Sequence, residues 1–481
     1  MGKFYEKIIW GLWIGLVLVL PITSMPLVAK LIHSSSVAPA ALIFLGLLCV
    51  LWLPVYLWKR GTFPVQTKVA LAFLAMGLFS TGASFFLNIP AYKDQSLVSN
   101  VISGVVTLCL GILFYLLTTV LPHDNEKIKR TLRALNWGGG IMLFWDILVV
   151  VITAFSPTDT PNYLRVIQHI FSTTTFFGTR SVGFAAEPSW LAHILNMVYL
   201  PYWFSATISG FTAHPRKLGK ISVENIFLVI GFGVLFSTLS REGLAAFILV
   251  LGFFFIRLNI LGLKKLRNRW SSKASKGIIT FVLAIGVIAV YLGAAVGCVF
   301  VLSKIDPRMK EVFSFDILKQ GGITKYADTL QFGERVTYWQ AGWNIFNAHS
   351  VLGVGLGNAG YYFQQMLPDK AWSLAEVRRL VYHSTGLLNI KNMWVRVLAE
   401  TGIVGFSVFL ILLVISGYTA VQLTRSSLPM KRTVGWMGIS MLISFLIEGF
   451  SVDSFALPYL WFTLGMVAAT WRWTKADPEG E

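Results

Sequence analysis

Charged residues are scarce in this sequence. Asp, Glu, Lys and Arg make up 13% of its 481 residues, whereas hydrophobic residues make up 55%. A water-soluble domain needs enough polar surface to cover its core, and this composition does not provide it. The chain is therefore expected to be a membrane protein that crosses the bilayer many times.

Residues that bind metals or form disulfides are also few. The three cysteines, Cys49, Cys109 and Cys298, all fall in apolar stretches, where they pack as small hydrophobic residues and indicate no disulfide framework. The seven histidines are scattered, and no metal-ligand spacing, internal repeat or low-complexity tract is present. No strand–turn–helix pattern precedes the glycines of GVGLGNAG (353–360), so they are not a dinucleotide-binding motif. Neither a metal nor a cofactor is expected.

Long hydrophobic runs occur along the whole chain. A helix needs about 20 apolar residues to cross a bilayer, and the sequence predicts an all-α polytopic membrane protein with about twelve such helices. Lys3 and Lys7 precede a long apolar run without a small-residue cleavage site, which favours an uncleaved first helix. The predicted spans are 8–32, 37–58, 69–88, 98–121, 134–155, 189–208, 222–239, 243–256, 277–301, 406–424, 433–450 and 457–472.

The distribution of basic residues predicts the orientation. Most of the 40 Lys and Arg fall in connections that lie on one side if both termini are cytoplasmic, which is the positive-inside pattern. The net charge of +18 therefore reflects topology rather than nucleic-acid binding. The basic run 257–276 is expected at the anionic lipid surface of the cytoplasmic side.

Two connections on the opposite side are long, 156–188 and 302–405, and function is expected there. The predicted organisation is nine membrane helices in 1–301, a large periplasmic loop domain in 302–405, and three helices with a cytoplasmic tail in 406–481.

Three arginines fall in or beside these outer connections: Arg180, Arg241 and Arg335. Each has an ordinary structural explanation, since Arg241 could extend to lipid headgroups, Arg180 could partner a helix cap, and Arg335 could pair with Glu334. Together they suggest a clamp for a polyanion, because the planar guanidinium donates two parallel hydrogen bonds to phosphate and stays charged. A lipid-linked pyrophosphate would suit a site at the membrane edge.

Several of these segments carry a family resemblance. The stretches TLSREGLAAFILVL (238–251), ERVTYWQAGWNIFNAHSVLGVGLGNAGYYF (334–363) and KNMWVRVLAETGIVGF (391–406) occur in an order that resembles the family of O-antigen ligases and Wzy-type O-antigen polymerases. The stretch RSVGFAAEPSWLA (180–192) resembles the polymerases of this family. The resemblance implies a GT-C-like membrane glycosyltransferase of the inner membrane with its active site in the periplasm.

The family pattern H-[NSQ]-x9-G-x-x-G is incomplete here. Asn392, Gly402 and Gly405 keep its spacing, but Lys391 stands at the position of the His. Lysine has a high unperturbed pKa, so Lys391 is expected to bind phosphate rather than to act as a base. His383, eight residues upstream, is a candidate to reach the same cavity.

The resemblance further implies transfer of a glycan from undecaprenyl pyrophosphate to an acceptor hydroxyl, with inversion and without a metal or nucleotide sugar. The arginines, with Lys391 and Asn392, would bind the pyrophosphate and glycan, and Glu187 or His383 would act as base. Loss of the family His and the presence of 180–192 favour a polymerase, which joins lipid-linked repeat units of O-antigen, capsule or exopolysaccharide. A ligase acting on lipid A-core is the alternative. A chain-length regulator is a conceivable partner.

A transporter of a lipid or solute is the alternative from another class. Asp146 and Glu448 are the main acidic residues within predicted spans, and such residues suggest function by default. Transporters typically contain internal repeats, which are not evident in this sequence.

Overall fold

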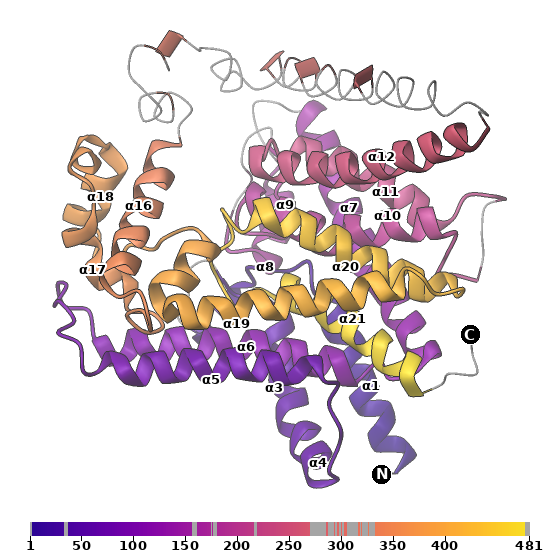
Figure 1. Ribbon diagram of the computed structural model, residues 1–481, viewed down its shortest axis with the longest axis horizontal. Coiled ribbons are helices and arrows are strands. Elements are labelled where there is room, and N and C mark those ends of the chain that lie inside the picture. Colours follow the sequence, from indigo (N-terminus) through magenta and orange to yellow (C-terminus); the bar gives the residue numbers. More distant parts are fainter. Residues whose placement is uncertain are drawn as a thin grey trace. The chain divides into compact units, whose positions relative to one another are not determined.

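The computed structural model describes residues 2–32, 37–155, 161–174, 176, 180–215, 219–269 and 332–476, with isolated residues between 285 and 326 (Figure 1). Every regular element in the described part is helical, and isolated β-bridges join Ser24 to Ala38 and to Ser172. The first helices are α1 (Lys3–Leu18), α2 (Pro26–Ile32), α3 (Ala41–Leu51), α4 (Leu53–Trp58), α5 (Gln66–Ser84), α6 (Leu97–Val120), α7 (Asn125–Phe155), α8 (Asn162–Phe171), α9 (Pro188–Ile194), the π-helix η1 (Leu195–Tyr199), α10 (Leu200–Ser209), α11 (Val223–Ser237) and α12 (Arg241–Arg269). The later ones are α16 (Gly333–Ala348), α17 (Ala359–Met366), the 3₁₀ helix η3 (Asp369–Ser373), α18 (Ala375–His383), α19 (Met393–Leu423), α20 (Pro429–Glu448) and α21 (Pro458–Ala476).

The chain divides into two compact units. The first contains residues 1–246, 342–366 and 387–481, and the second contains 247–341 and 367–386. Within the first unit, α5 packs against α19, α6 against α21, and α10 against α20. Its core is therefore built from helices far apart in sequence.

The prediction of an all-helical polytopic membrane protein is confirmed. Among the described residues, six helices are long and apolar enough to cross a membrane: Ala41–Trp58, Gln66–Ser84, Leu97–Val120, Asn125–Thr153, Arg241–Ile260 and Met393–Leu423. Helices α1, α11, α20 and α21 also coincide with predicted spans. The ninth predicted span, 277–301, lies outside the described residues apart from isolated positions.

The first two predicted spans are interrupted. Helix α1 ends at Leu18, and the chain turns before α2 begins at Pro26, because Pro21 and Pro26 cannot continue a regular helix. The second predicted span contains α3 and α4, which meet at Trp52, two residues before Pro54. The prediction of one continuous helix over 8–32 was therefore wrong.

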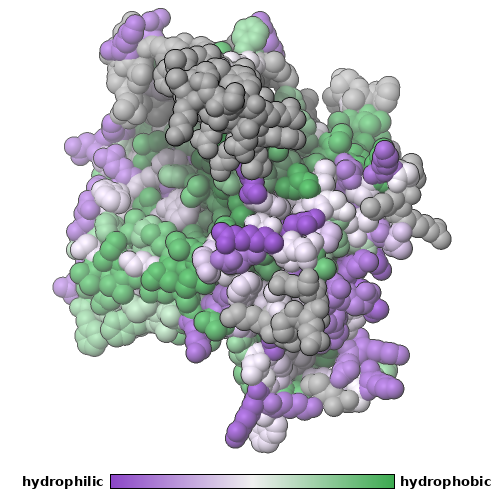
Figure 2. All heavy atoms as spheres, turned by 45° about the vertical axis from the view of Figure 1, so that its right-hand side comes forward, coloured by the Kyte–Doolittle hydropathy of each residue, from purple (hydrophilic) through white to green (hydrophobic). Residues whose placement is uncertain are grey.

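Exposed apolar side chains are abundant on the helices that match spans. Val50, Val229 and Val414 are among the most exposed large hydrophobic residues of these helices. Figure 2 shows broad apolar areas on the visible face of the molecule. Lipid chains are the environment that such a surface requires, because in water it would be costly to expose.

Helix α19 is interrupted at Gly402, which has φ 63°. The glycine-rich segment 350–355 inserts at this break. The main-chain oxygens of Ala399 and Glu400 accept hydrogen bonds from Val354 and Gly355, each 2.9 Å long, and the Ile403 N–H donates to Ser350 O over 2.8 Å. Main-chain hydrogen bonds thus join the segment 350–355 to α19 on both sides of Gly402. They satisfy main-chain polar groups that an interrupted helix would otherwise leave without partners.

The stretch from α9 to α10 contains a π-helical turn, η1. Pro201, in the first turn of α10, has no N–H to donate to Met197 O, and the Thr463 hydroxyl of α21 donates to that oxygen instead, over 2.8 Å. Such π turns occur often at functional sites, and this one carries the buried side chain of Asn196.

Candidate functional site

Arg180 lies beside the turn that precedes Arg241. Its Nε donates to Thr238 O over 2.9 Å, and the Ser181 N–H donates to Ser237 O over 3.0 Å. The turn is tight, since α11 ends at Ser237 and α12 begins at Arg241, whose Nε and Nη2 atoms are buried. Two of the three predicted arginines therefore occupy one corner of the first unit.

Glu187 is the N-cap residue of α9, with Pro188 in the first helical turn as predicted. Its side chain is exposed, and the Ser189 hydroxyl donates to Glu187 Oε2 over 3.4 Å. The carboxylate lies at the N-terminal end of α9, the end at which acidic side chains are preferred. The segment thus presents an accessible anion seven residues after Arg180.

A buried polar cluster joins α9, η1, α12 and α20. Glu448, at the end of α20, accepts a hydrogen bond from Asn196 Nδ2 over 2.6 Å and is hydrogen-bonded to Nδ1 of His193. The same Asn196 Nδ2 donates to Gly243 O in the first turn of α12, 2.7 Å away. His193, Asn196 and Glu448 are almost fully buried. Hydrogen bonds from both neighbours offset the cost of burying the carboxylate.

The N-terminus of α19 lies next to this cluster. The Met393 N–H donates to Gly449 O over 2.7 Å, directly after Glu448 in sequence. Asn392, one of the predicted substrate-binding residues, is buried, and its Oδ1 caps α19 by accepting from the Val395 N–H over 3.1 Å. Lys391 has φ 51°, and its N–H donates to Asn389 Oδ1. Asn392 therefore shapes the helix start that carries Lys391.

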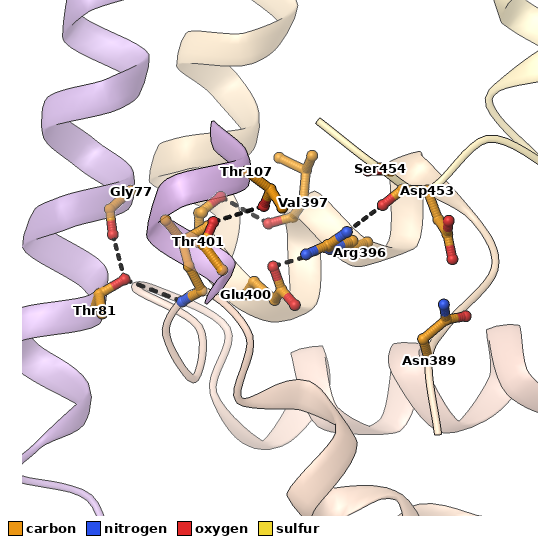
Figure 3. Close-up of polar contacts among 12 residues, drawn as sticks. Gly77, Thr81, Thr107, Asn389, Arg396, Val397, Glu400, Thr401, Asp453 and Ser454 are labelled. Carbon is orange, nitrogen blue, oxygen red and sulfur yellow. Dashed lines mark hydrogen bonds and ion pairs between the residues drawn. The ribbon is translucent and has the colours of Figure 1, made fainter. Parts of the chain in front are cut away.

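One turn further along α19, Arg396 forms a largely buried ion pair. Its Nε donates to Glu400 Oε2 over 3.1 Å, its Nη1 donates to Asp453 O, and its guanidinium lies over the Phe455 ring. Figure 3 shows the Arg396 guanidinium pointing between Glu400 and the backbone of Asp453. This pair connects α19 to the segment between α20 and α21.

The second unit holds the remaining two predicted residues. The Arg335 guanidinium lies 5.8 Å from the centre of the Phe332 ring, and His383 is the exposed last residue of α18. The Tyr338 hydroxyl donates to Glu376 Oε1 over 3.1 Å, which links α16 to α18. Burial and the nearby carboxylate of Glu376 raise the pKa of Tyr338. The structure thus brings Arg180, Glu187, Arg241, Lys391 and Asn392 into one unit and Arg335 and His383 into the other.

Residues 226–410 match the family model Wzy_C, described as O-antigen ligase. This region belongs to the O-antigen ligase family. No curated protein matches the chain. The ligase-family region begins in α11 and ends in α19, so it contains the turn of Arg241, the glycine-rich segment and the break at Gly402. The resemblance inferred from the motifs is confirmed.

Several polar residues of the site escaped sequence reasoning. His193 and Asn196 are spaced three apart on a helix, Arg396 and Glu400 four apart, and both spacings place side chains on one face. That spacing was the available signal, but their partners, Glu448 and Asp453, come from distant segments. Within the described residues, no group of three or more His, Cys, Asp or Glu could hold a metal ion.

Proposed function

We propose that this chain is a polysaccharide polymerase of the inner membrane that transfers a glycan from undecaprenyl pyrophosphate to the hydroxyl of another lipid-linked repeat unit. The family match supports an enzyme of O-antigen ligase or polymerase type acting on lipid-linked glycans. The observation that carries the proposal is the hydrogen bond of Arg180 to Thr238, because it joins the segment of one arginine to the turn that leads into the other. A diphosphate has the matching charge and oxygen geometry.

The hydrogen bonds between connections support the proposed twelve-span topology. Connections predicted on the outer side bond to the outer parts of neighbouring predicted spans: Arg180 to Thr238, Thr173 to Ser24, and Met393 to Gly449. On the inner side, connections bond to one another or to the inner end of a span, with bonds from Arg133 to Ala213, from Arg432 to Ser209 and from Arg472 to Thr62. This separation is what alternating spans produce. It supports cytoplasmic termini and a periplasmic site.

The chemistry needs few groups. The acceptor oxygen attacks the anomeric carbon while the bond from that carbon to the pyrophosphate oxygen breaks, so the configuration inverts. Arg180 and Arg241 stabilise the growing charge on the leaving pyrophosphate, and Lys391 and Arg335 are proposed as further ligands. Pyrophosphate is a good leaving group, so no acid is needed. A base must take the acceptor proton, and the sequence suggests Glu187 or His383.

The acceptor distinguishes two activities. A polymerase holds two lipid carriers, whereas a ligase holds one carrier and lipid A-core. The segment 180–192, which resembles polymerases, forms the arginine corner and the start of α9, and this supports the polymerase. The description of the matched family favours a ligase as the second candidate.

The test uses the full-length protein in detergent with undecaprenyl-pyrophosphate-linked repeat units, and products are resolved on a gel. The wild type should give a ladder that Arg241→Ala abolishes, while Arg241→Lys retains part of the activity because a point charge replaces the planar fork. Arg130→Ala, at an exposed pair with Glu126, is the matched control and should leave the ladder unchanged. A product only when lipid A-core is supplied would indicate the ligase. No product with either acceptor would contradict both.

A further inference from the structure

The cluster of His193, Asn196 and Glu448 contains a titratable pair without a role in the mechanism above. The exposed fraction of the side chain is 2% for His193 and 0% for Glu448. Burying a carboxylate at the end of a membrane helix is costly, and such residues are rarely kept for packing alone. Of the two side chains, only the imidazole of His193 has any exposed surface, so a ligand can reach the pair only through it.

The hydrogen bonds determine which nitrogen of His193 can act. Because Glu448 is an acceptor when ionised, it holds the proton of the imidazole on Nδ1. Nε2 is then the basic nitrogen, and no described residue hydrogen-bonds to it. Asn196 donates to the other carboxylate oxygen and holds Glu448 in place. A carboxylate that orients an imidazole in this way is the arrangement by which hydrolases set the tautomer of a catalytic base.

The pair lies where the motif segments of the first unit meet. Helices α9 and α12 approach closely, because a Cβ on Gly243 would come within 2.6 Å of the Ala192 Cβ. His193, the residue after Ala192, therefore lies beside the first turn of α12, the helix that begins at Arg241. Glu448 adjoins Gly449, whose oxygen accepts from Met393. The same segments thus place His193 near the start of α19, where Lys391 stands at the position of the family His.

We propose that His193, oriented by Glu448 and Asn196, accepts the proton of the acceptor hydroxyl; this inference rests on the proposed function and replaces Glu187 and His383 in that role. The acceptor O–H bond breaks as its oxygen bonds to the anomeric carbon, and the proton moves to Nε2. The electron pair of the broken glycosidic bond leaves with the pyrophosphate. The imidazolium formed is paired with the Glu448 carboxylate, and its proton then returns to water.

The tautomer can be measured without turnover. In protein labelled with ¹⁵N-histidine, each of the seven histidines contributes ring-nitrogen signals. At neutral pH, the signal lost in His193→Gln should be that of a neutral ring with its proton on Nδ1. Glu448→Gln should shift the same signal, and it assigns that signal if His193→Gln does not fold. A doubly protonated ring, or a neutral ring with its proton on Nε2, would overturn the proposal.

Turnover tests the role. In the ladder assay, His193→Gln should lower kcat by about 10²–10⁴-fold, the range for general base catalysis, with KM for the lipid-linked donor within about 3-fold of wild type. Glu448→Gln should lower kcat as well, while His169→Gln, an exposed histidine of α8, is the matched control and should behave as wild type. A folded His193→Gln protein with kcat within about 3-fold of wild type would overturn the role of His193 as the base and leave the proposed function unaffected. A wild-type protein that is inactive with both acceptors would overturn the proposed function. It would also overturn the role of His193, because there would be no acceptor hydroxyl to deprotonate.

Discussion

The Nε atom of Arg180 donates a hydrogen bond to the main-chain oxygen of Thr238, 2.9 Å away. The two residues are 58 positions apart, and the bond joins the segment before α9 to the turn between α11 and α12. Because the acceptor is a backbone oxygen, the side chain of Arg180 supports the turn that places Arg241. A guanidinium carries five N–H donors, so an arginine that supports a turn is also chemically suited to bind an anion.

Arg180→Ala should therefore affect both the support of the turn before Arg241 and the binding of the pyrophosphate. We expect kcat/KM for polymer formation to fall by about 10²–10³-fold, the range for removing one charge-stabilising donor. Arg180→Lys should recover less than a tenth of the loss, because an ammonium cannot bond to Thr238 and present a planar fork to phosphate. Initial rates at several donor concentrations measure this. Equal activity of the Ala and wild-type proteins would show that Arg180 has no part in the site.

Gly402→Ala should destabilise the protein. The residue has φ 63°, and a Cβ there would lie 2.1 Å from Val351 O. Left-handed backbone alone costs about 1–3 kcal/mol for a residue with a side chain, and the overlap adds to that cost. Gly252→Ala is the control, since a Cβ at Gly252 meets nothing within 4 Å. Thermal unfolding in detergent should show a clear decrease in Tm for Gly402→Ala and none for Gly252→Ala.

The pair of Arg396 and Glu400 should be strongly coupled. Removing one partner of a buried pair costs about 3–5 kcal/mol, because the remaining charge is left uncompensated. Arg396→Met should thus be much less stable than Arg396→Met combined with Glu400→Gln. The exposed pair of Arg130 and Glu126 has the same spacing along a helix and should show coupling of only about 0.3–0.5 kcal/mol. Double-mutant cycles on denaturant unfolding would compare them, and additive effects at Arg396 and Glu400 would contradict the expectation.

His349 should make stability depend on pH. Burial lowers the pKa of His349, which lies against the Tyr362 ring. The unfolded chain therefore binds the proton more tightly, so stability is complete above about pH 6.5 and declines as pH falls below that value. Comparing the Tm of wild type and His349→Gln between pH 7.5 and pH 5 isolates this contribution. The substituted protein should lose less stability, and an equal loss in both would show that His349 is not responsible.

Much of the helical architecture could be predicted from the sequence, because apolar length alone identifies a helix that can cross a bilayer. Pro188 likewise marked the start of α9, since proline suits the first turn of a helix. The interruption of 8–32 was missed because hydropathy does not register where two prolines break a helix. The glycines at 402 and 405 were recognised as a pattern, but the insertion of 350–355 at Gly402 depends on main-chain groups that the sequence does not reveal.

The sequence by itself determined the class of protein, the helical class of the fold and the resemblance of residues 226–410 to the O-antigen ligases, because composition, span length and motif order are local properties of the chain. It also identified Arg180, Arg241 and Arg335 as candidate ligands of a pyrophosphate. The tertiary structure decided the partners of the buried polar residues. His193 and Glu448 are 255 positions apart, and their hydrogen bond exists only because the ends of α9 and α20 meet in the folded chain.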